Sequence, residues 1–365
     1  MEILKHCFIA GALALLFVSC EGNIDNIIGS VGPDVGKDTT GVVEPPKDTT
    51  GVVDPPKDTT EVVVPPVDTT EVVVPPVDTT EVVVPPVGVT TRVWYELPVI
   101  ADADGNGIDD NNSDLYYAYH LCDLRSPSGH KARNYAVCFS AEHHCPYWVS
   151  APRHDMYSAK NVNRTNAYQA DPDIPASLQY RSKSTGGGCN KGHMLGSAER
   201  LASGTTNRQV FYYSNIAPQL SSGFNTGGGG WNILEDWVDT KVCADTLYEV
   251  IGCYFDKYTD GYGYTASPKK IEFGGRSDVS IPTMFYYVLL RTRSGSTRKA
   301  LKDCTRDELM CVAFVRTHTN SLKGQKPSSK EMMSVADLEK ITGFTYFPNV
   351  PQAPKDSFKA SDWGL

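Results

Sequence analysis

The sequence lacks any hydrophobic segment long enough to cross a bilayer as a helix. Its longest apolar run, residues 8–18, has eleven residues, whereas a spanning helix needs about 20. It also lacks a CxxC pair, which argues against a cysteine-ligated zinc site. The region after residue 88 lacks a large net charge of either sign, since its twenty-nine acidic and thirty basic residues leave only +1. Any phosphate-binding surface in that region must therefore be local.

The N-terminus has the order of a secretion signal. Lys5 precedes the apolar run and Ser19-Cys20 ends it. This order resembles a bacterial lipoprotein signal, which implies cleavage after residue 19 and lipidation of Cys20. The alternative is an ordinary secretory signal with an incidental cysteine. We therefore expect a signal peptide over residues 1–19 and an exported chain anchored through Cys20 to the bacterial outer membrane, periplasmic or at the cell surface.

A ten-residue repeat follows the signal. Residues 38–87 read DTTGVVEPPK, DTTGVVDPPK and then DTTEVVVPPV three times. Each unit carries Pro-Pro and too little apolar bulk for a core, which predicts a disordered, semi-rigid stalk of polyproline II character over residues 20–88. The thirteen acidic and three basic residues of 21–88 account for the negative charge of the chain. Asp-Thr-Thr also resembles a bacterial O-glycosylation motif; a bare protein stalk is the alternative.

Eight cysteines remain after Cys20. An even number of cysteines in an exported chain predicts up to four disulfides, whose pairing the sequence does not reveal. By the same reasoning, Cys189 is expected to be half of a disulfide rather than a nucleophile.

Residues 89–365 predict one α+β domain with a mainly antiparallel sheet flanked by helices. Near-helical spacing of apolar residues predicts a helix over 232–243, and Ser334 with Gly343 brackets a second helix over 334–341. Aromatic and β-branched residues predict strands over 93–97, 115–121, 135–139, 147–150, 209–216, 245–254, 283–291 and 309–316.

Several short motifs occur in a fixed order between residues 190 and 235. They are Asn190-Lys191-Gly192-His193, SAER at 197–200, SNIAPQ at 214–219, Phe224-Asn225 before a glycine run and Trp231, and finally Glu235. In this order they resemble the DNA/RNA non-specific endonuclease family of the ββα-metal, or His-Me finger, type. Residues 148–149, 164–175 and 334–351 also fit, so the resemblance covers most of 93–351.

The resemblance implies a ββα-metal fold and Mg²⁺-dependent hydrolysis of DNA and RNA with little sequence preference, leaving 5′-phosphate ends. Such hydrolysis needs an activated water and neutralised phosphate charge. The family uses its motif histidine as the general base, which implies His193. A neutral histidine can act in this way near pH 7. The alternative is an ordinary histidine that is hydrogen-bonded in a loop.

The resemblance also implies a metal site. The family holds a single Mg²⁺ largely through water and one asparagine, which matches Asn225 and suits the oxygen preference of Mg²⁺. Glu235 matches the family glutamate that supports the shell of metal-bound water. The alternatives are an asparagine in a turn and a solvated helix glutamate. Mn²⁺ or another divalent cation is the alternative cofactor.

Three basic residues are candidates for contacting phosphate. Lys191 stands where the family has arginine, and a lysine cannot form the bidentate fork. Arg164 lies where the family has another phosphate-contacting arginine, and its alternative is a surface role. Arg200 is a second phosphate contact or a helix-surface charge. Asn190 replaces the motif aspartate, while Asn215 is expected to pin the end of a strand.

Two further segments have competing interpretations. The glycine run 227–230 is two residues longer than the family spacing, and it widens the cleft or is simply floppy. The segment DADGNGIDD, 102–110, resembles a calcium loop but lacks its final glutamate, so an Asp/Gly/Asn turn is the preferred interpretation.

Two other functions compete with a nuclease. The first is a surface lipoprotein whose site has weakened and that only binds nucleic acid, as the changes at Asn190 and Lys191 suggest. The second is a structural or adhesive lipoprotein without a nucleic-acid role, which would show no salt-dependent DNA binding. The sequence implies DNA, RNA and a membrane as partners, and it leaves the oligomeric state open.

Overall fold

The computed structural model describes residues 94–125, 131–225 and 227–365. The predicted signal peptide and stalk lie outside these residues. Within the described ranges, none of the helices has both the length and the hydrophobicity that a membrane span requires.

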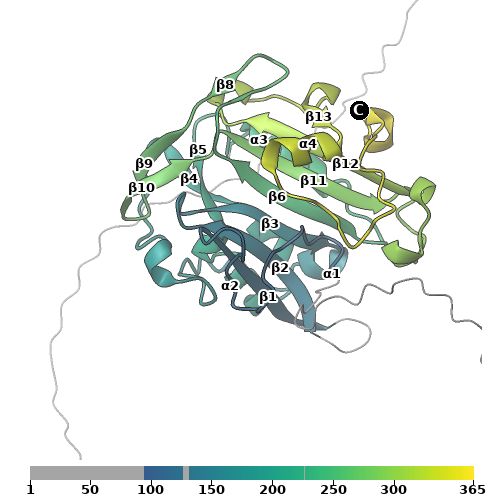
Figure 1. The fold of residues 1–365 in the computed structure, drawn as a ribbon, viewed down its shortest axis with the longest axis horizontal. Coiled ribbons are helices and arrows are strands. Elements are labelled where there is room, and N and C mark those ends of the chain that lie inside the picture. The colour runs from purple at the N-terminus through teal and green to yellow at the C-terminus, as the bar shows by residue number, and fades with distance from the viewer. Residues whose placement is uncertain (1–93, 126–130, 226) are drawn as a thin grey trace, which may run out of the picture. The chain divides into compact units, whose positions relative to one another are not determined.

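A seven-stranded sheet forms the centre of the domain, and all of its pairings are antiparallel (Figure 1). This confirms the predicted α+β class with a mainly antiparallel sheet. In spatial order the strands are β1 (Leu115–Arg125), β2 (Lys131–Ser140), β3 (Cys145–Arg153), β6 (Leu247–Tyr254), β11 (Met284–Thr292), β12 (Leu309–Thr317) and β13 (Met332–Met333). Three two-stranded pairs lie outside it: β4 (Cys189–His193) with β5 (Ile216–Leu220), β7 (Tyr258–Thr259) with β8 (Thr265–Ala266), and β9 (Lys269–Phe273) with β10 (Arg276–Ile281).

The helices are short. The α-helices are α1 (Asp155–Ser158), α2 (Gly204–Gln209), α3 (Gly230–Asp239) and α4 (Val335–Thr342). Single 3₁₀ turns occupy Ala176–Leu178, Ser197–Arg200, Tyr213–Asn215, Leu301–Asp303, Arg306–Glu308, Asn320–Leu322, Ser329–Glu331 and Ala360–Trp363. Helix α4 begins at its predicted cap, since Ser334 accepts from the backbone N–H of Asp337, and it ends at Gly343 in the left-handed conformation.

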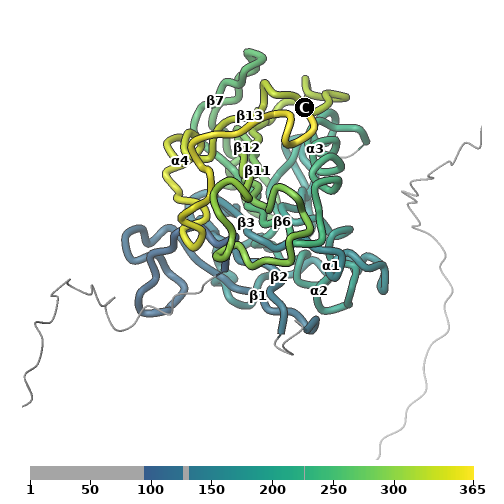
Figure 2. Tube along the Cα trace, turned by 90° about the vertical axis from the view of Figure 1, so that its right-hand side faces the viewer, coloured from purple at the N-terminus to yellow at the C-terminus, as the bar shows by residue number. Residues whose placement is uncertain are grey.

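Both faces of the central sheet are covered, which explains why its middle strands are apolar throughout. Strand β11 alternates between two cores: Phe285 and Tyr287 face the first, while Tyr286 and Val288 face the second. Helix α3 contributes to the first core and α4 to the second. Figure 2 shows these two helices on opposite sides of the sheet. The central strands therefore serve as a rigid wall behind the elements on each face.

A ββα unit lies on the face of the first core. Strands β4 and β5 pair antiparallel with His193 opposite Ile216, and α3 follows after a glycine-rich loop. Trp231, Leu234 and Val238 form the buried stripe of α3. The adjacent position, Glu235, lies beside this stripe and is half-buried.

The glycine run before α3 has a defined conformation. Gly227 and Gly228 have positive φ angles of 68° and 78°, which favour glycine. A side chain at Gly229 would meet the backbone of Phe224 and Asn225, the closest atoms at 2.4 Å. The extra glycines thus allow the chain to turn tightly back toward Phe224 before α3 begins. Neither a widened cleft nor a floppy segment is needed to explain them.

Two predicted strands are wrong. Residues 94–97 form a turn, in which Leu97 donates to the carbonyl of Trp94. Residues 209–216 contain the end of α2, a turn and a 3₁₀ helix, and strand β5 begins only at Ile216. The run 209–216 is buried almost throughout, and a continuous apolar run does not distinguish a strand from other buried backbone. The remaining predicted strands and both helices are present with shifted ends.

The predicted disulfides are also absent. The eight cysteines of the described residues are free thiols: Cys122, Cys138, Cys145, Cys189, Cys243, Cys253, Cys304 and Cys311. No strand pairing among the described residues places one cysteine opposite another. Cys189 belongs to the first core and Cys311 to the second, on the other face of the sheet. These side chains act as small apolar residues, and burial raises the pKa of the Cys189 thiol to about 11.

The segment 102–110 is a turn, as preferred. Its polar side chains accept hydrogen bonds from nearby backbone: Asp104 from the N–H of Asn106 at 3.1 Å, and Asn106 from the N–H of Ile108 at 2.7 Å. Such bonds are typical of Asx turns.

Arg316 at the end of β12 allows a test of how the sheet supports α3. Its buried guanidinium lies 3.0 Å from Glu331 and donates to the carbonyl of Gly230, the first residue of α3. In Arg316→Met the Glu331 carboxylate would lose its partner, which should lower the free energy of unfolding by about 3–5 kcal/mol. Urea unfolding measures this change, and the double variant with Glu331→Gln should lose less. A single variant as stable as the wild type would contradict this account.

Candidate active site

One cleft brings together most of the predicted site residues. It has a volume of about 280 Å³ and lies where β4, β5 and α3 meet the 3₁₀ turn at Ser197. Its lining is Arg164, Lys191, His193, Gly196, Ser197, Ala198, Glu199, Gln219, Asn225, Asn232, Glu235, Asp236 and Asp239. The predicted base, metal ligand, supporting glutamate and two phosphate contacts therefore share one cavity, and of the predicted catalytic-domain residues only Arg200 does not line it.

His193 ends β4 and faces the cleft. Its ring meets Phe211 edge-on at 4.8 Å, and its buried Nε2 has no hydrogen-bond partner among the described residues. Burial, followed by the positive charges of Arg164 and Lys191, lowers the pKa of His193 to about 3. The imidazole is therefore neutral at pH 7 and has a lone pair with which to accept a proton. An unpartnered buried polar atom is costly, and such atoms are typical of functional sites.

Asn225 is oriented by Gln219 on β5. The amide nitrogen of Asn225 donates to Oε1 of Gln219 at 2.5 Å, so Oδ1 of Asn225 is the remaining polar atom of that side chain. Its backbone N–H donates to the carbonyl of Leu220 at 2.9 Å. These two bonds fix the amide so that it presents an oxygen, which is the donor type that Mg²⁺ prefers.

Sequence reasoning assigned no role to Gln219. This side chain is 1% exposed, and its Nε2 has no partner among the described residues. It lies across Gly192 of β4, where an added Cβ would come within 2.1 Å of the glutamine Cδ. The glycine of the Lys-Gly-His motif is thus required by the packing of Gln219. The available signal was a glutamine in an otherwise apolar strand.

Four acidic side chains also line the cleft: Glu199, Glu235, Asp236 and Asp239. Burial, together with the charges of Glu199, Asp239 and Asp236, raises the pKa of Glu235 well above its usual value. Behind them, the single guanidinium of Arg153 lies 3.1 Å from Glu199 and 2.5 Å from Asp239. It also lies 3.2 Å from buried Glu249. Because the carboxylates outnumber this cation, a divalent cation bound near Glu235 and Asn225 would relieve their repulsion. The donor set therefore fits Mg²⁺.

Arg164 and Lys191 lie on the histidine side of the cleft. The guanidinium of Arg164 stacks over Phe211 at 4.8 Å and donates to Asn166 at 2.8 Å. The Lys191 ammonium donates to the carbonyl of Lys183 at 2.9 Å and lies 5.2 Å from the centre of the Tyr168 ring. Each cation is held in place by these contacts, and each keeps further N–H donors that could bind an anion in the cleft.

The prediction that Arg200 contacts substrate is wrong. Its side chain is fully buried and lies over the ring of Tyr157 at 4.5 Å. Its donors bond to Asn134 and to the carbonyls of Pro152 and Glu199. It therefore ties the 3₁₀ turn after β4 to β2 and β3. The interpretation of Asn215 as structural is confirmed, because its side chain bonds to both the N–H and the carbonyl of Leu195.

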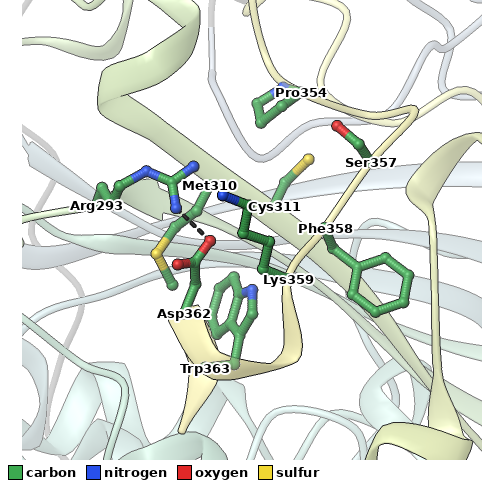
Figure 3. Close-up of a pocket in the computed structure, with 9 residues that line it drawn as sticks. All are labelled: Arg293, Met310, Cys311, Pro354, Ser357, Phe358, Lys359, Asp362 and Trp363. Carbon is green, nitrogen blue, oxygen red and sulfur yellow. Dashed lines mark hydrogen bonds and ion pairs between the residues drawn. The ribbon is translucent and has the colours of Figure 1, made fainter. Parts of the chain in front are cut away.

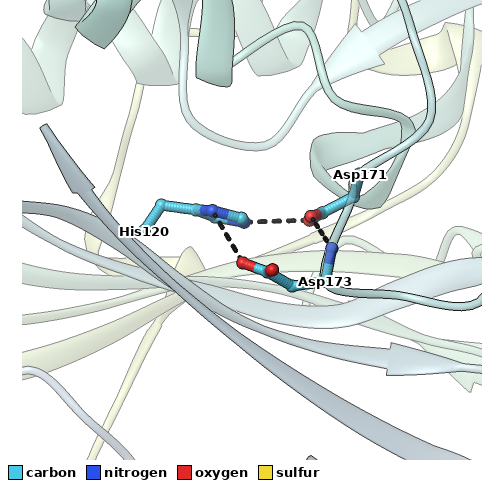
Figure 4. A group of neighbouring side chains, drawn as sticks. All are labelled: His120, Asp171 and Asp173. Atoms are coloured by element: carbon cyan, nitrogen blue, oxygen red, sulfur yellow. Dashed lines mark hydrogen bonds and ion pairs between the residues drawn. The ribbon is translucent and has the colours of Figure 1, made fainter. Parts of the chain in front are cut away.

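A second group, His120 with Asp171 and Asp173, has side chains close enough to share a metal ion (Figure 4). Nε2 of His120 lies 2.9 Å from Asp171, but the neighbour of Asp173 at 3.7 Å is Nδ1. The 2.9 Å separation is a hydrogen-bonding distance, so in this structure His120 and Asp171 form a hydrogen-bonded pair with Asp173 beside the ring. Asp171 also accepts from Ser214, just before β5.

A small cavity of about 130 Å³ lies between β12 and the C-terminal segment (Figure 3). An ion pair of Arg293 with Asp362 crosses it. Burial raises the pKa of the Cys311 thiol in its wall to about 12, which leaves that thiol unreactive. None of the predicted site residues lines this cavity.

Comparison with known proteins gives one family. A family model described as DNA/RNA non-specific endonuclease matches residues 123–353. The chain is 27% identical over 224 residues to human "Nuclease EXOG, mitochondrial", which covers 60% of this chain and 56% of that protein. It is 27% identical over 198 residues to "Nuclease C1" of Cunninghamella echinulata var. echinulata, covering 53% of this chain and 71% of that protein. The match thus spans little more than half of the human relative.

Among solved structures, a crystal structure of the EndoG/EndoGI complex is similar to 64% of this chain and 89% of its own, with 22% identity and a TM-score of 0.48. A likeness at this level adds nothing to the family assignment.

The electrostatics of His193 can be tested by titration. Because a neighbouring cation favours the neutral imidazole, Arg164→Gln or Lys191→Gln should raise the pKa of His193. Burial is the larger cause and remains, so the value should stay below 6.5. NMR titration of the ring protons measures the shift, with exposed Arg208→Gln as a control outside the cleft. A wild-type pKa near 6.5 would contradict the described environment.

Proposed function

Because the chain belongs to the DNA/RNA non-specific endonuclease family, we propose that it is a Mg²⁺-dependent nuclease that hydrolyses phosphodiester bonds of DNA and RNA. The observation that carries the proposal is that His193, whose Nε2 has no partner among the described residues, lines a cleft shared with Asn225 and Glu235. A proton acceptor, an oxygen donor for a metal and two cations for phosphate are thus assembled in one cavity.

The chemistry of hydrolysis assigns a task to each residue. The neutral imidazole of His193 takes a proton from a water molecule, whose oxygen forms the new bond to phosphorus. The 3′-oxygen leaves and takes a proton from solvent, which gives a 5′-phosphate end. Arg164 and Lys191 bind the phosphate and offset its charge.

Asn225, through Oδ1, and Glu235, through ordered water, would hold the ion. When bound, Mg²⁺ supplies positive charge that stabilises the charge developing on the phosphate oxygens. In this proposal Arg164 and Lys191 contact phosphates, which carry no sequence information directly, and this supports cleavage with little sequence preference. Lys191 in place of arginine offers a single-point contact, so this phosphate contact is weaker than the family pattern implies.

Plasmid cleavage by the purified chain tests this function. With Mg²⁺ the wild type should cut, and excess chelator should abolish cutting. His193→Ala should lower the rate about 10²–10⁴-fold, which is the range of a general base. His143→Ala is a matched control, because this histidine lies outside the cleft and bonds to Ser280 and Tyr147. Salt-dependent binding without chelator-sensitive cutting would leave only the binding alternative.

We further propose that the chain acts outside the cytoplasm, anchored by lipid on Cys20. Support comes from the apolar run of residues 8–18 ending at Ser19-Cys20, and from the repeat that separates it from the domain. Cys20→Ala should move the protein from the membrane fraction to the soluble fraction, as followed by immunoblotting. Retention of the variant in the membrane fraction would contradict the lipid anchor.

A further inference from the structure

His318 lies directly after β12 and behind the loop that carries Asn225. It is 5% exposed, and its ring packs against Phe224 at 4.5 Å and Phe285 at 5.0 Å. It does not line the cleft, so it cannot touch a substrate there. Neither the family motifs nor the proposed mechanism gives this buried histidine a task.

The hydrogen bonds of His318 fix its tautomer. Nδ1 lies 2.8 Å from the carbonyl oxygen of Pro282, which can only accept, so Nδ1 carries the proton. Nε2 lies 2.8 Å from the backbone nitrogen of Leu220, which can only donate, so Nε2 is the acceptor. Both ring nitrogens are therefore used, and the ring is neutral. Consistently, burial lowers the pKa of His318 to about 4.

Leu220 connects this histidine to the proposed metal ligand. It ends β5, and its carbonyl accepts the backbone N–H of Asn225 at 2.9 Å. The carbonyl of Leu220 thus accepts a hydrogen bond from Asn225, while its N–H donates one to His318. Displacement of the Leu220 peptide would move Asn225 with it.

The loop itself supplies little rigidity. It contains five glycines between residues 223 and 230, which have few conformational restrictions of their own. Anchors from the 318–325 segment hold it instead: Gly223 packs against the backbone of Asn320, and Gly324 donates to the carbonyl of Gly228 at 3.0 Å. Of these anchors, His318 is connected to Asn225 by the shortest series of hydrogen bonds, through Leu220 alone.

We propose that His318 is a positioning residue for the metal site, acting through Leu220 to hold Asn225 where its Oδ1 can bind a divalent cation. This inference rests on the proposed role of Asn225. Residues that orient metal ligands without touching the ion typically change metal affinity 10–100-fold when they are replaced.

Binding of Mn²⁺ to the full chain, followed by electron paramagnetic resonance without any substrate, tests the inference. Asn225→Ala identifies the signal of the cleft site. His318→Phe keeps a ring but loses both hydrogen bonds, and it should weaken binding at this site by about 10–100-fold. His318→Gln retains one acceptor and one donor and should recover much of that loss. His143→Phe removes a comparable pair of side-chain bonds elsewhere and should leave the affinity unchanged.

Thermal melting of each variant separates loss of folding from loss of binding. A folded His318→Phe variant with wild-type Mn²⁺ affinity would overturn the inference and leave His318 a structural residue. If that variant does not fold, amide exchange in the wild type decides: the amides of Leu220 and Asn225 should both be protected. Rapid exchange of the Leu220 amide would show that the bond to His318 does not form.

The outcome is separable from that of the proposed function. If the wild type binds Mn²⁺ through Asn225 but cuts no plasmid, the nuclease proposal fails while the role of His318 is still measured. If the wild type cuts plasmid and His318→Phe binds Mn²⁺ normally, only the inference fails.

Discussion

The short antiparallel pairing of β4 with β5 is the constraint on which the rest of the site depends. Its register places His193 opposite Ile216 and Asn190 opposite Gln219. A shift by one residue would turn every side chain of the pair to the other face. Gln219 can reach Asn225 only because Gly192 has no side chain in its path. The histidine and the asparagine are thus related through five residue pairs of β4 and β5, followed by the loop that carries Asn225.

The cleft separates charge by position. Arg164 and Lys191 lie near His193, and they help to keep its imidazole neutral. The carboxylates around Glu235, of which Glu199 and Glu249 are buried, outnumber the guanidinium groups of Arg153 and Arg200 beside them. Such an arrangement is unfavourable for an isolated protein but suits a site that receives a divalent cation and a phosphate together, because each bound group meets the charge that it needs.

Much of the domain could be predicted from its pattern, and the failures share a cause. The sheet strands and the helix carrying Glu235 follow from periodicity, because they bury one stripe or lie between two cores. The run at 209–216 was misassigned because nearly all of its residues are buried, so no alternation between buried and exposed positions distinguishes a strand from a helix or turn. Arg200 was misassigned because the neighbouring sequence does not show that its guanidinium donates to backbone carbonyls. The disulfides were predicted from the number of cysteines alone, while the sheet separates several of these thiols.

The sequence by itself determined the ordered motifs, and with them the family and five of the residues that share the cleft. It could do so because the chemistry of a base, a metal ligand and a phosphate contact limits the residue types at each position. The contacts of Gln219, Arg153 and His318, on which their proposed roles rest, are visible only in the tertiary structure. Their partners lie far away in the sequence, and the pairing of buried donors with acceptors depends on how the chain folds. The same folding lowers the pKa of His193 and raises that of Glu235, since burial and neighbouring charge exist only once these segments meet.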